Sequence, residues 1–167
     1  MQGLLGCPKS GLQLKRMQHI AESRYLKELC LEAAYVGDEG VLPLKDLLPF
    51  LRRLNLRHNK LTDVAVEFLA QNLEHATDLV DLNLSANSIG NTGARALATA
   101  LKSTNSLRVL NLEQNDIGAA AGAAVGQGLA SNLSMRILKL TDNRICDLGI
   151  GKSSLACYIQ CRCTIYF

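Results

Sequence analysis

One pattern recurs four times in this chain at a fixed spacing. The pattern is LxxLxLxxNx(L/I), and its copies begin at Leu51, Leu79, Leu107 and Met135, so the interval between successive starts is constant. Self-similarity at a period of roughly 20 to 50 residues is typical of stacked repeat architectures, in which each unit buries its apolar face against its neighbours. The period therefore constrains the fold more than any other feature of the sequence.

A fifth, divergent copy precedes these four. Leu26, Leu29 and Leu31 repeat the leucine spacing of the motif. Ala34 replaces the asparagine, and this unit is shorter than the others because the next copy already begins at Leu51. Such divergence is expected of a terminal repeat, which has a neighbour on one side only.

Each copy predicts a strand followed by a helix. Leucines alternate with other residues in Leu54-Asn55-Leu56, so a short strand turns its leucines to one face. Ala65 and Leu69 begin a series with a spacing of four, which lies on one helical stripe. Strand-helix-strand units coil right-handedly. We therefore predict an α/β fold, a right-handed solenoid of about five repeats forming a short horseshoe arc, with parallel strands on the concave face and helices on the convex face.

The repeats resemble leucine-rich repeats. In addition, residues 93–101 read GARALATAL, which is similar to the GAxALAxAL segment of the ribonuclease-inhibitor-like subfamily. That subfamily includes ribonuclease inhibitor, the sensing arrays of NOD-like receptors and the GTPase-activating protein of Ran. The likeness covers roughly residues 26–149 and implies long repeats with a full helix, joined by a ladder of asparagines.

The repeats divide the chain into three parts. Residues 1–25 are an N-terminal segment in which we expect a capping helix, and residues 26–150 are the repeats, starting at 26, 51, 79, 107 and 135. Ser153 and Cys157 stand where the next helix needs apolar residues. Residues 151–167 are therefore a Cys-rich apolar tail, interpreted either as a cap over the last repeat or as a truncated repeat whose exposed stacking surface permits self-association.

Two further features of the repeats have structural interpretations. An amide side chain at the end of each strand can satisfy backbone groups left unpaired by the turn. This asparagine column comprises Asn59, Asn87, Asn115 and Asn143. The helix expected after the motif at Leu107 contains Gly122, Gly126 and Gly128, each of which costs about 1 kcal/mol relative to Ala. We predict that this helix exchanges its amide protons faster than the helices expected at 65–74 and 93–102.

Composition argues against several classes of function. The net charge of +3 comes from 18 basic and 15 acidic residues that are evenly mixed, whereas nucleic-acid binding usually needs a concentrated basic face. There is neither a secretory signal nor an apolar run long enough to cross a membrane. We expect a cytoplasmic protein that binds neither nucleic acid nor membrane.

The sequence predicts no cofactor and no catalytic centre. Cys157, Cys161 and Cys163 lack the paired spacing of zinc sites, so free thiols in an apolar tail are the favoured interpretation. The residues at 149–153, Gly-Ile-Gly-Lys-Ser, lack the first glycine of a phosphate-binding loop. The three histidines are scattered, and none has a nucleophile positioned by the repeat.

Equivalent strand positions are expected to form columns about 4.8 Å apart on the concave face. Arg53 falls between Glu28 and Asp81, so its charge serves either lateral pairing or partner contact. Val109 and Ile137 are an apolar pair at adjacent exposed positions, which is typical of the centre of an interface. The candidate partner-binding residues are Arg53, Asn55, Arg57, His58, Asp81, Asn83, Val109, Asn111, Glu113, Ile137 and Lys139.

The resemblance implies a protein-binding function rather than an enzymatic one. We predict a non-enzymatic scaffold that binds a protein partner through the concave face. Two alternatives remain within the subfamily: a regulator of a small GTPase, like the Ran GTPase activator, and a fragment of a NOD-like receptor sensor array. Ribonuclease inhibition is disfavoured, because gripping a basic enzyme calls for an acidic inner face, whereas this chain is mildly basic and has too few repeats to enclose one.

Overall fold

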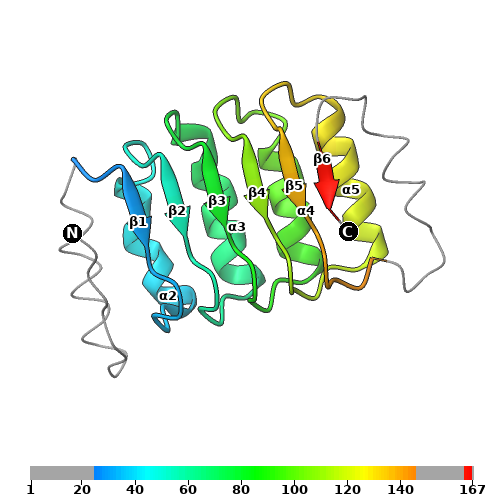
Figure 1. Ribbon diagram of the computed structural model, residues 1–167, viewed down its shortest axis with the longest axis horizontal. Coiled ribbons are helices and arrows are strands. Elements are labelled where there is room, and N and C mark those ends of the chain that lie inside the picture. Colours follow the sequence, from blue (N-terminus) through cyan, green and yellow to red (C-terminus); the bar gives the residue numbers. More distant parts are fainter. Residues whose placement is uncertain (1–24, 146–163, 167) are drawn as a thin grey trace.

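A computed structural model describes residues 25–145 and 164–166 of the 167-residue chain. Within these ranges, six short strands form one parallel sheet in chain order (Figure 1). The strands are β1 (Glu28–Cys30), β2 (Arg53–Asn55), β3 (Asp81–Asn83), β4 (Val109–Asn111), β5 (Ile137–Lys139) and β6 (Thr164–Tyr166). The first five belong to the five predicted repeats.

The strands align residue for residue because the repeat length is nearly constant. Arg53 pairs with Asp81, for example, and Asp81 with Val109. The middle residue of each strand from β1 to β5 is a buried leucine, and its two neighbours face the opposite side of the sheet. These leucines are Leu29, Leu54, Leu82, Leu110 and Leu138.

Helices connect the strands and form a second layer behind the sheet (Figure 1). They are α2 (Gly37–Val41), the 3-10 turn η1 (Leu42–Asp46), α3 (Asp63–Asn72), the 3-10 turn η2 (Leu73–His75), α4 (Asn91–Ala100) and α5 (Ala119–Ala130). The stripe predicted on α3 is buried, with Ala65 and Leu69 at most 1% exposed. Strand leucines and helix stripes share one continuous core. The predicted α/β solenoid, with strands on one face and helices on the other, is confirmed.

The asparagine column forms the predicted ladder between repeats. Asn59 lies in the interior, where its Nδ2 donates to the carbonyl oxygen of Leu31 at 2.8 Å. Its Oδ1 accepts from the backbone N–H groups of Ala34 and Val36 at 3.0 and 3.1 Å. The equivalent inter-repeat donations are Asn87 to Leu56, Asn115 to Leu84 and Asn143 to Leu112. These amides therefore satisfy buried backbone groups at the ends of the strands.

A second ladder, which we did not predict from the sequence, joins the beginnings of the helices. A carboxylate or amide at the start of one helix accepts a hydrogen bond from the backbone N–H that precedes the next helix. The pairs are Asp38 with Thr62 at 2.8 Å, Asp63 with Gly90 at 2.7 Å and Asn91 with Gly118 at 2.8 Å. Acidic groups are favourable at helix N-termini, so the two aspartates also stabilise their own helices.

The turn after each strand from β1 to β5 has a left-handed residue that is not glycine. These residues have φ between 53° and 57°, and they are Ala33, His58, Ala86, Gln114 and Asp142. Such a conformation costs about 1–3 kcal/mol per residue unless the surroundings hold it. The backbone N–H of His58 donates to the carbonyl oxygen of Ser85 at 3.0 Å, and Ala33, Ala86 and Gln114 make equivalent bonds to the next repeat. These hydrogen bonds offset the strain.

Part of the predicted tail continues the sheet. β6 pairs in parallel with β5, and Thr164 lies beside Ile137. Ile165 packs against the core. We did not predict this strand because it lacks the leucines of the motif. The expected N-terminal capping helix, the cluster of Cys157, Cys161 and Cys163, and the Gly-Lys-Ser segment lie outside the described residues.

Candidate functional site

The six strands lie side by side in one sheet, with the helices on its other side (Figure 1). We call the surface of their outward-facing side chains the strand face. It consists of the first and third residues of β1 to β6: Glu28, Cys30, Arg53, Asn55, Asp81, Asn83, Val109, Asn111, Ile137, Lys139, Thr164 and Tyr166. Most of the predicted binding residues lie here. The exceptions are Arg57, His58 and Glu113, which lie just beyond their strands in the turns.

The part of the strand face from β1 to β3 is charged, and its charges pair laterally. Arg53 Nη1 lies 2.9 Å from Glu28 Oε1, and in the turns just beyond these strands Arg57 Nε lies 3.7 Å from Glu32 Oε1. The side chains of the first pair are both 58% exposed. Exposed pairs of this kind contribute only about 0–1 kcal/mol. Lateral pairing therefore occurs, but it holds the two arginines weakly.

Asp81 differs from the other acids on the strand face because it is half-buried. Loss of solvent raises the pKa of its carboxyl above the usual 3.8, and the positive charges of Arg53 and Lys139 oppose part of that rise. Buried carboxyl groups with a raised pKa occur in binding and catalytic sites more often than elsewhere on a surface. Asp81 lies at the boundary between the charged strands and the apolar ones.

Asparagines at the third position of the central strands have an internal role. The Oδ1 atoms of Asn55, Asn83 and Asn111 accept the backbone N–H two residues later, at 2.9–3.0 Å. This side-chain bond mimics a turn and directs the chain away from the strand. Asn111 Nδ2 also donates to Glu113 Oε2 at 3.0 Å. A partner would meet these residues chiefly through their remaining N–H groups.

The part from β4 to β6 holds the apolar side chains of the strand face, with polar residues among them. Val109 and Ile137 are both half-buried and lie side by side in register. Tyr166 is 48% exposed, and Lys139 Nζ lies 5.9 Å from the centre of its ring, within the range of a cation–π contact. We missed Tyr166 in the sequence. The signal that could have found it is its distance along the chain from Lys139, which is only one residue shorter than the repeat period.

The remaining predicted positions differ in exposure. His58 is exposed in its left-handed turn. Ser85 stands in its repeat where Arg57 and Glu113 stand in theirs, but it is only 3% exposed, and its hydroxyl donates to Asn83 Oδ1 at 2.7 Å. Cys30 is exposed and its thiol is free.

The described residues offer no obvious site for a metal ion. No group of three His, Cys, Asp or Glu side chains within residues 25–145 and 164–166 is arranged to hold one. In the same ranges, every buried polar side-chain atom has a hydrogen-bond partner. None of the helices described is both long and apolar enough to cross a membrane. The arrangement can offer a surface for recognition, with apolar and charged parts side by side.

Comparison with known proteins supports the repeat architecture. The family described as "Leucine Rich repeat" matches residues 48–70, 75–98 and 104–126. A search of curated protein sequences finds no significant match. A solved structure described as "Leiomodin-1 Actin-Binding Site 2 (ABS2)" is similar with a TM-score of 0.71 over 92% of this chain and 88% of that one, at 17% identity. Likeness at such low identity shows the fold alone.

Proposed function

We propose that this leucine-rich repeat protein is a non-enzymatic scaffold that binds a protein partner through its strand face. The observation that carries the proposal is the apolar pair of Val109 and Ile137, which lies beside charged and polar residues, with Tyr166 on the next strand in register with Lys139. Interfaces typically have an apolar centre surrounded by a polar rim. The centre usually contributes most of the binding energy.

The repeat architecture supports this proposal. Stacked strands present a wide, regular surface on which each repeat adds one strip about 4.8 Å wide. Leucine-rich repeat domains generally mediate protein–protein interaction, and the similar leiomodin-1 structure is described as an actin-binding site. Actin is therefore a reasonable first candidate to test. Fold likeness alone does not imply a shared partner.

We also propose the finer family assignment to the ribonuclease-inhibitor-like subfamily. Its support is the GARALATAL segment, residues 93–101, which makes up most of α4 and includes buried Gly93, Ala94 and Ala98. A Cβ at Gly93 would lie 2.7 Å from Asp63 Oδ1, so glycine lets α4 begin close to α3.

A cytoplasmic location stays a prediction from the sequence.

The proposal is tested by capture with matched variants. The full chain is immobilised and exposed to cell extract, and in parallel it is sedimented with purified actin filaments. Val109→Asp places a charge in the apolar area. Val64→Asp is the control, because Val64 is 65% exposed on α3, in the helix layer. Both variants are first checked for an unchanged circular dichroism spectrum and unfolding midpoint.

We expect the wild type and Val64→Asp to retain the same partner, and Val109→Asp to lose it. A buried charge without a counterion in an interface centre weakens binding by about 2 kcal/mol or more. Retention of the partner by a folded Val109→Asp variant would contradict the proposal. So would stimulation of GTP hydrolysis when the chain is added to a small GTPase, because that activity belongs to a different class of function.

A further inference from the structure

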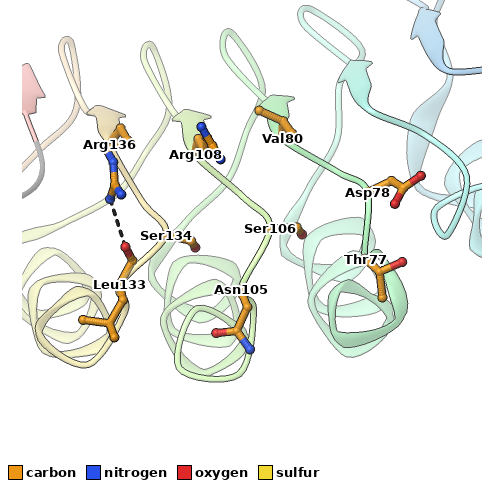
Figure 2. Close-up of a pocket in the computed structure, with 9 residues that line it drawn as sticks. All are labelled: Thr77, Asp78, Val80, Asn105, Ser106, Arg108, Leu133, Ser134 and Arg136. Atoms are coloured by element: carbon orange, nitrogen blue, oxygen red, sulfur yellow. Dashed lines mark hydrogen bonds between the residues drawn. The ribbon is translucent and has the colours of Figure 1, made fainter.

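An open pocket of about 530 Å³ lies at the edge of the sheet, outside the strand face (Figure 2). It is formed by the connections that lead from a helix into β3, β4 and β5. Each connection contributes residues at the same three positions of its repeat, because these repeats are equal in length. The residues are Thr77, Asp78, Val80, Asn105, Ser106, Arg108, Leu133, Ser134 and Arg136.

The pocket lies on a column of basic residues that precedes the strands. Consecutive backbone hydrogen bonds join residues 27, 52, 80, 108 and 136 across the sheet. Four of these five positions hold a basic residue, and Val80 is the exception. Arg108 and Arg136 are exposed neighbours at the pocket. From the sequence alone, we treated the basic residues as evenly mixed and missed this column, which emerges only once the strands are in register.

The two arginines are available to a ligand. Arg136 Nη1 donates to the carbonyl oxygens of Leu133 and Met135 at 2.9 and 3.0 Å, which holds its guanidinium group at the pocket and leaves its other N–H groups unused (Figure 2). Within the part of the chain that the structure describes, neither Arg108 nor Arg136 forms an ion pair with an acid. A guanidinium held in place loses less conformational entropy when it binds.

The other groups of the pocket leave it positively charged and partly apolar. Asp78 is its single acid among the lining residues, and its carboxylate lies 3.2 Å from Lys27 Nζ. The hydroxyls of Ser106 and Ser134 donate to backbone carbonyl oxygens at 2.8 and 2.9 Å. Leu133 is 67% exposed, so its side chain offers an apolar contact at the pocket.

We propose that this edge pocket binds an acidic segment of a protein, with carboxylates on Arg108 and Arg136 and an apolar side chain against Leu133. The planar guanidinium group suits carboxylates because it can donate two parallel hydrogen bonds. An apolar contact beside these pairs adds specificity that charge alone does not give. This site is distinct from the strand face, and either surface could bind without the other.

The test uses defined peptides and the full chain. The probe is a fluorescein-labelled peptide in which glutamates flank a leucine, and its affinity is measured by fluorescence anisotropy. Two comparison peptides replace the glutamates with glutamine or with lysine. The pocket variant is Arg108→Glu with Arg136→Glu. The control variant is Lys45→Glu with Arg95→Glu, which changes the net charge equally at exposed positions outside the pocket.

We expect the wild type to bind the glutamate peptide about tenfold more tightly than the glutamine peptide. The pocket variant should lose that preference and favour the lysine peptide, while the control variant should keep the wild-type preference. Equal binding of the glutamate and glutamine peptides, no binding of either, or equal loss in both variants would overturn the proposal. Because the probe is not the partner of the strand face, each of these failures leaves the proposed function standing.

Discussion

The two parts of the strand face differ in what their side chains contact. From β1 to β3, the charges have neighbours of opposite sign, as in the pair of Arg53 with Glu28. From β4 to β6, Val109 and Ile137 are half-buried, so part of each apolar side chain is still exposed to water. Covering the apolar part would remove more unfavourable contact with water, at about 25 cal/mol per Å². We therefore assign affinity to the apolar part and orientation to the charged part.

The helices behind these two parts differ as well. α3, which follows β2, has buried Ala65, Val66 and Leu69, whereas α5, which follows β4, has seven buried residues that include three glycines. From the sequence alone, we interpreted those glycines as a weakness. The structure gives Gly128 another role, because a Cβ there would collide with the backbone of Ala98 in α4. Its missing side chain therefore lets α5 pack closely against α4.

The largest expected effect is a loss of partner binding that differs between substitutions in the two parts of the strand face. Ile137→Asp should weaken partner binding by about 2 kcal/mol or more, because it places a charge in the centre of the interface. Arg53→Ala should weaken it by about 1 kcal/mol or less, because the exposed pair with Glu28 contributes little. Titration of the captured partner against both variants measures the difference. Equal losses would remove the distinction between the two parts.

A second prediction concerns the support of the apolar part. Gly128→Ala should lower the free energy of unfolding by about 1–3 kcal/mol, because the added methyl group pushes α5 away from α4. Ala130→Gly is the matched control, since it changes an exposed position of the same helix and should cost no more than about 1 kcal/mol. Urea denaturation measures both. If Gly128→Ala stabilised the protein, the glycine would be a helix weakness and not a packing requirement.

The smallest expected effect concerns Asp81, at the boundary. Its folded-state pKa is raised, chiefly by burial, so its ionised form is less favourable in the folded protein than in the unfolded one. Asp81→Asn should therefore be more stable than the wild type above the folded-state pKa. As pH falls through the folded pKa and then below 3.8, Asp81 becomes protonated in both states and the difference should disappear.

Unfolding midpoints of the wild type and Asp81→Asn, measured across this pH range, test the prediction. Glu28→Gln is a useful comparison because it removes an exposed acid from the same surface. A stability advantage of Asp81→Asn that persisted unchanged at low pH would show that the effect does not come from ionisation of the carboxyl.

Much of the fold followed from the repeat period. The constant interval between the motifs placed the strands, the helix stripes and the Asn59 ladder, because each of these depends on neighbouring copies being in register. It did not reveal β6, since Thr164 to Tyr166 lack the leucines and follow at a different spacing. Local turn geometry was also hidden. His58 adopts a left-handed conformation that a histidine alone does not indicate, because a hydrogen bond to the next repeat holds it.

The sequence predicted which residues of the candidate site face outward, but not which hydrogen bonds their side chains make. Alternation within strands showed which residues face outward, including Val109 and Ile137. It could not show that the Oδ1 of Asn83 accepts from its own turn, because such bonds depend on the exact backbone conformation. The edge pocket could not be predicted either, because it forms only where three connections lie side by side. Arg108 and Arg136 become neighbours only in that arrangement.

The most direct test of the central claim is photo-cross-linking from the two parts of the strand face. A benzophenone amino acid replaces Ile137 in one sample and Arg53 in another, and both are irradiated in cell extract containing the partner. We predict that position 137 forms the stronger cross-link, because it lies at the centre of the contact. A cross-link that forms from position 53 and not from position 137 would contradict that claim.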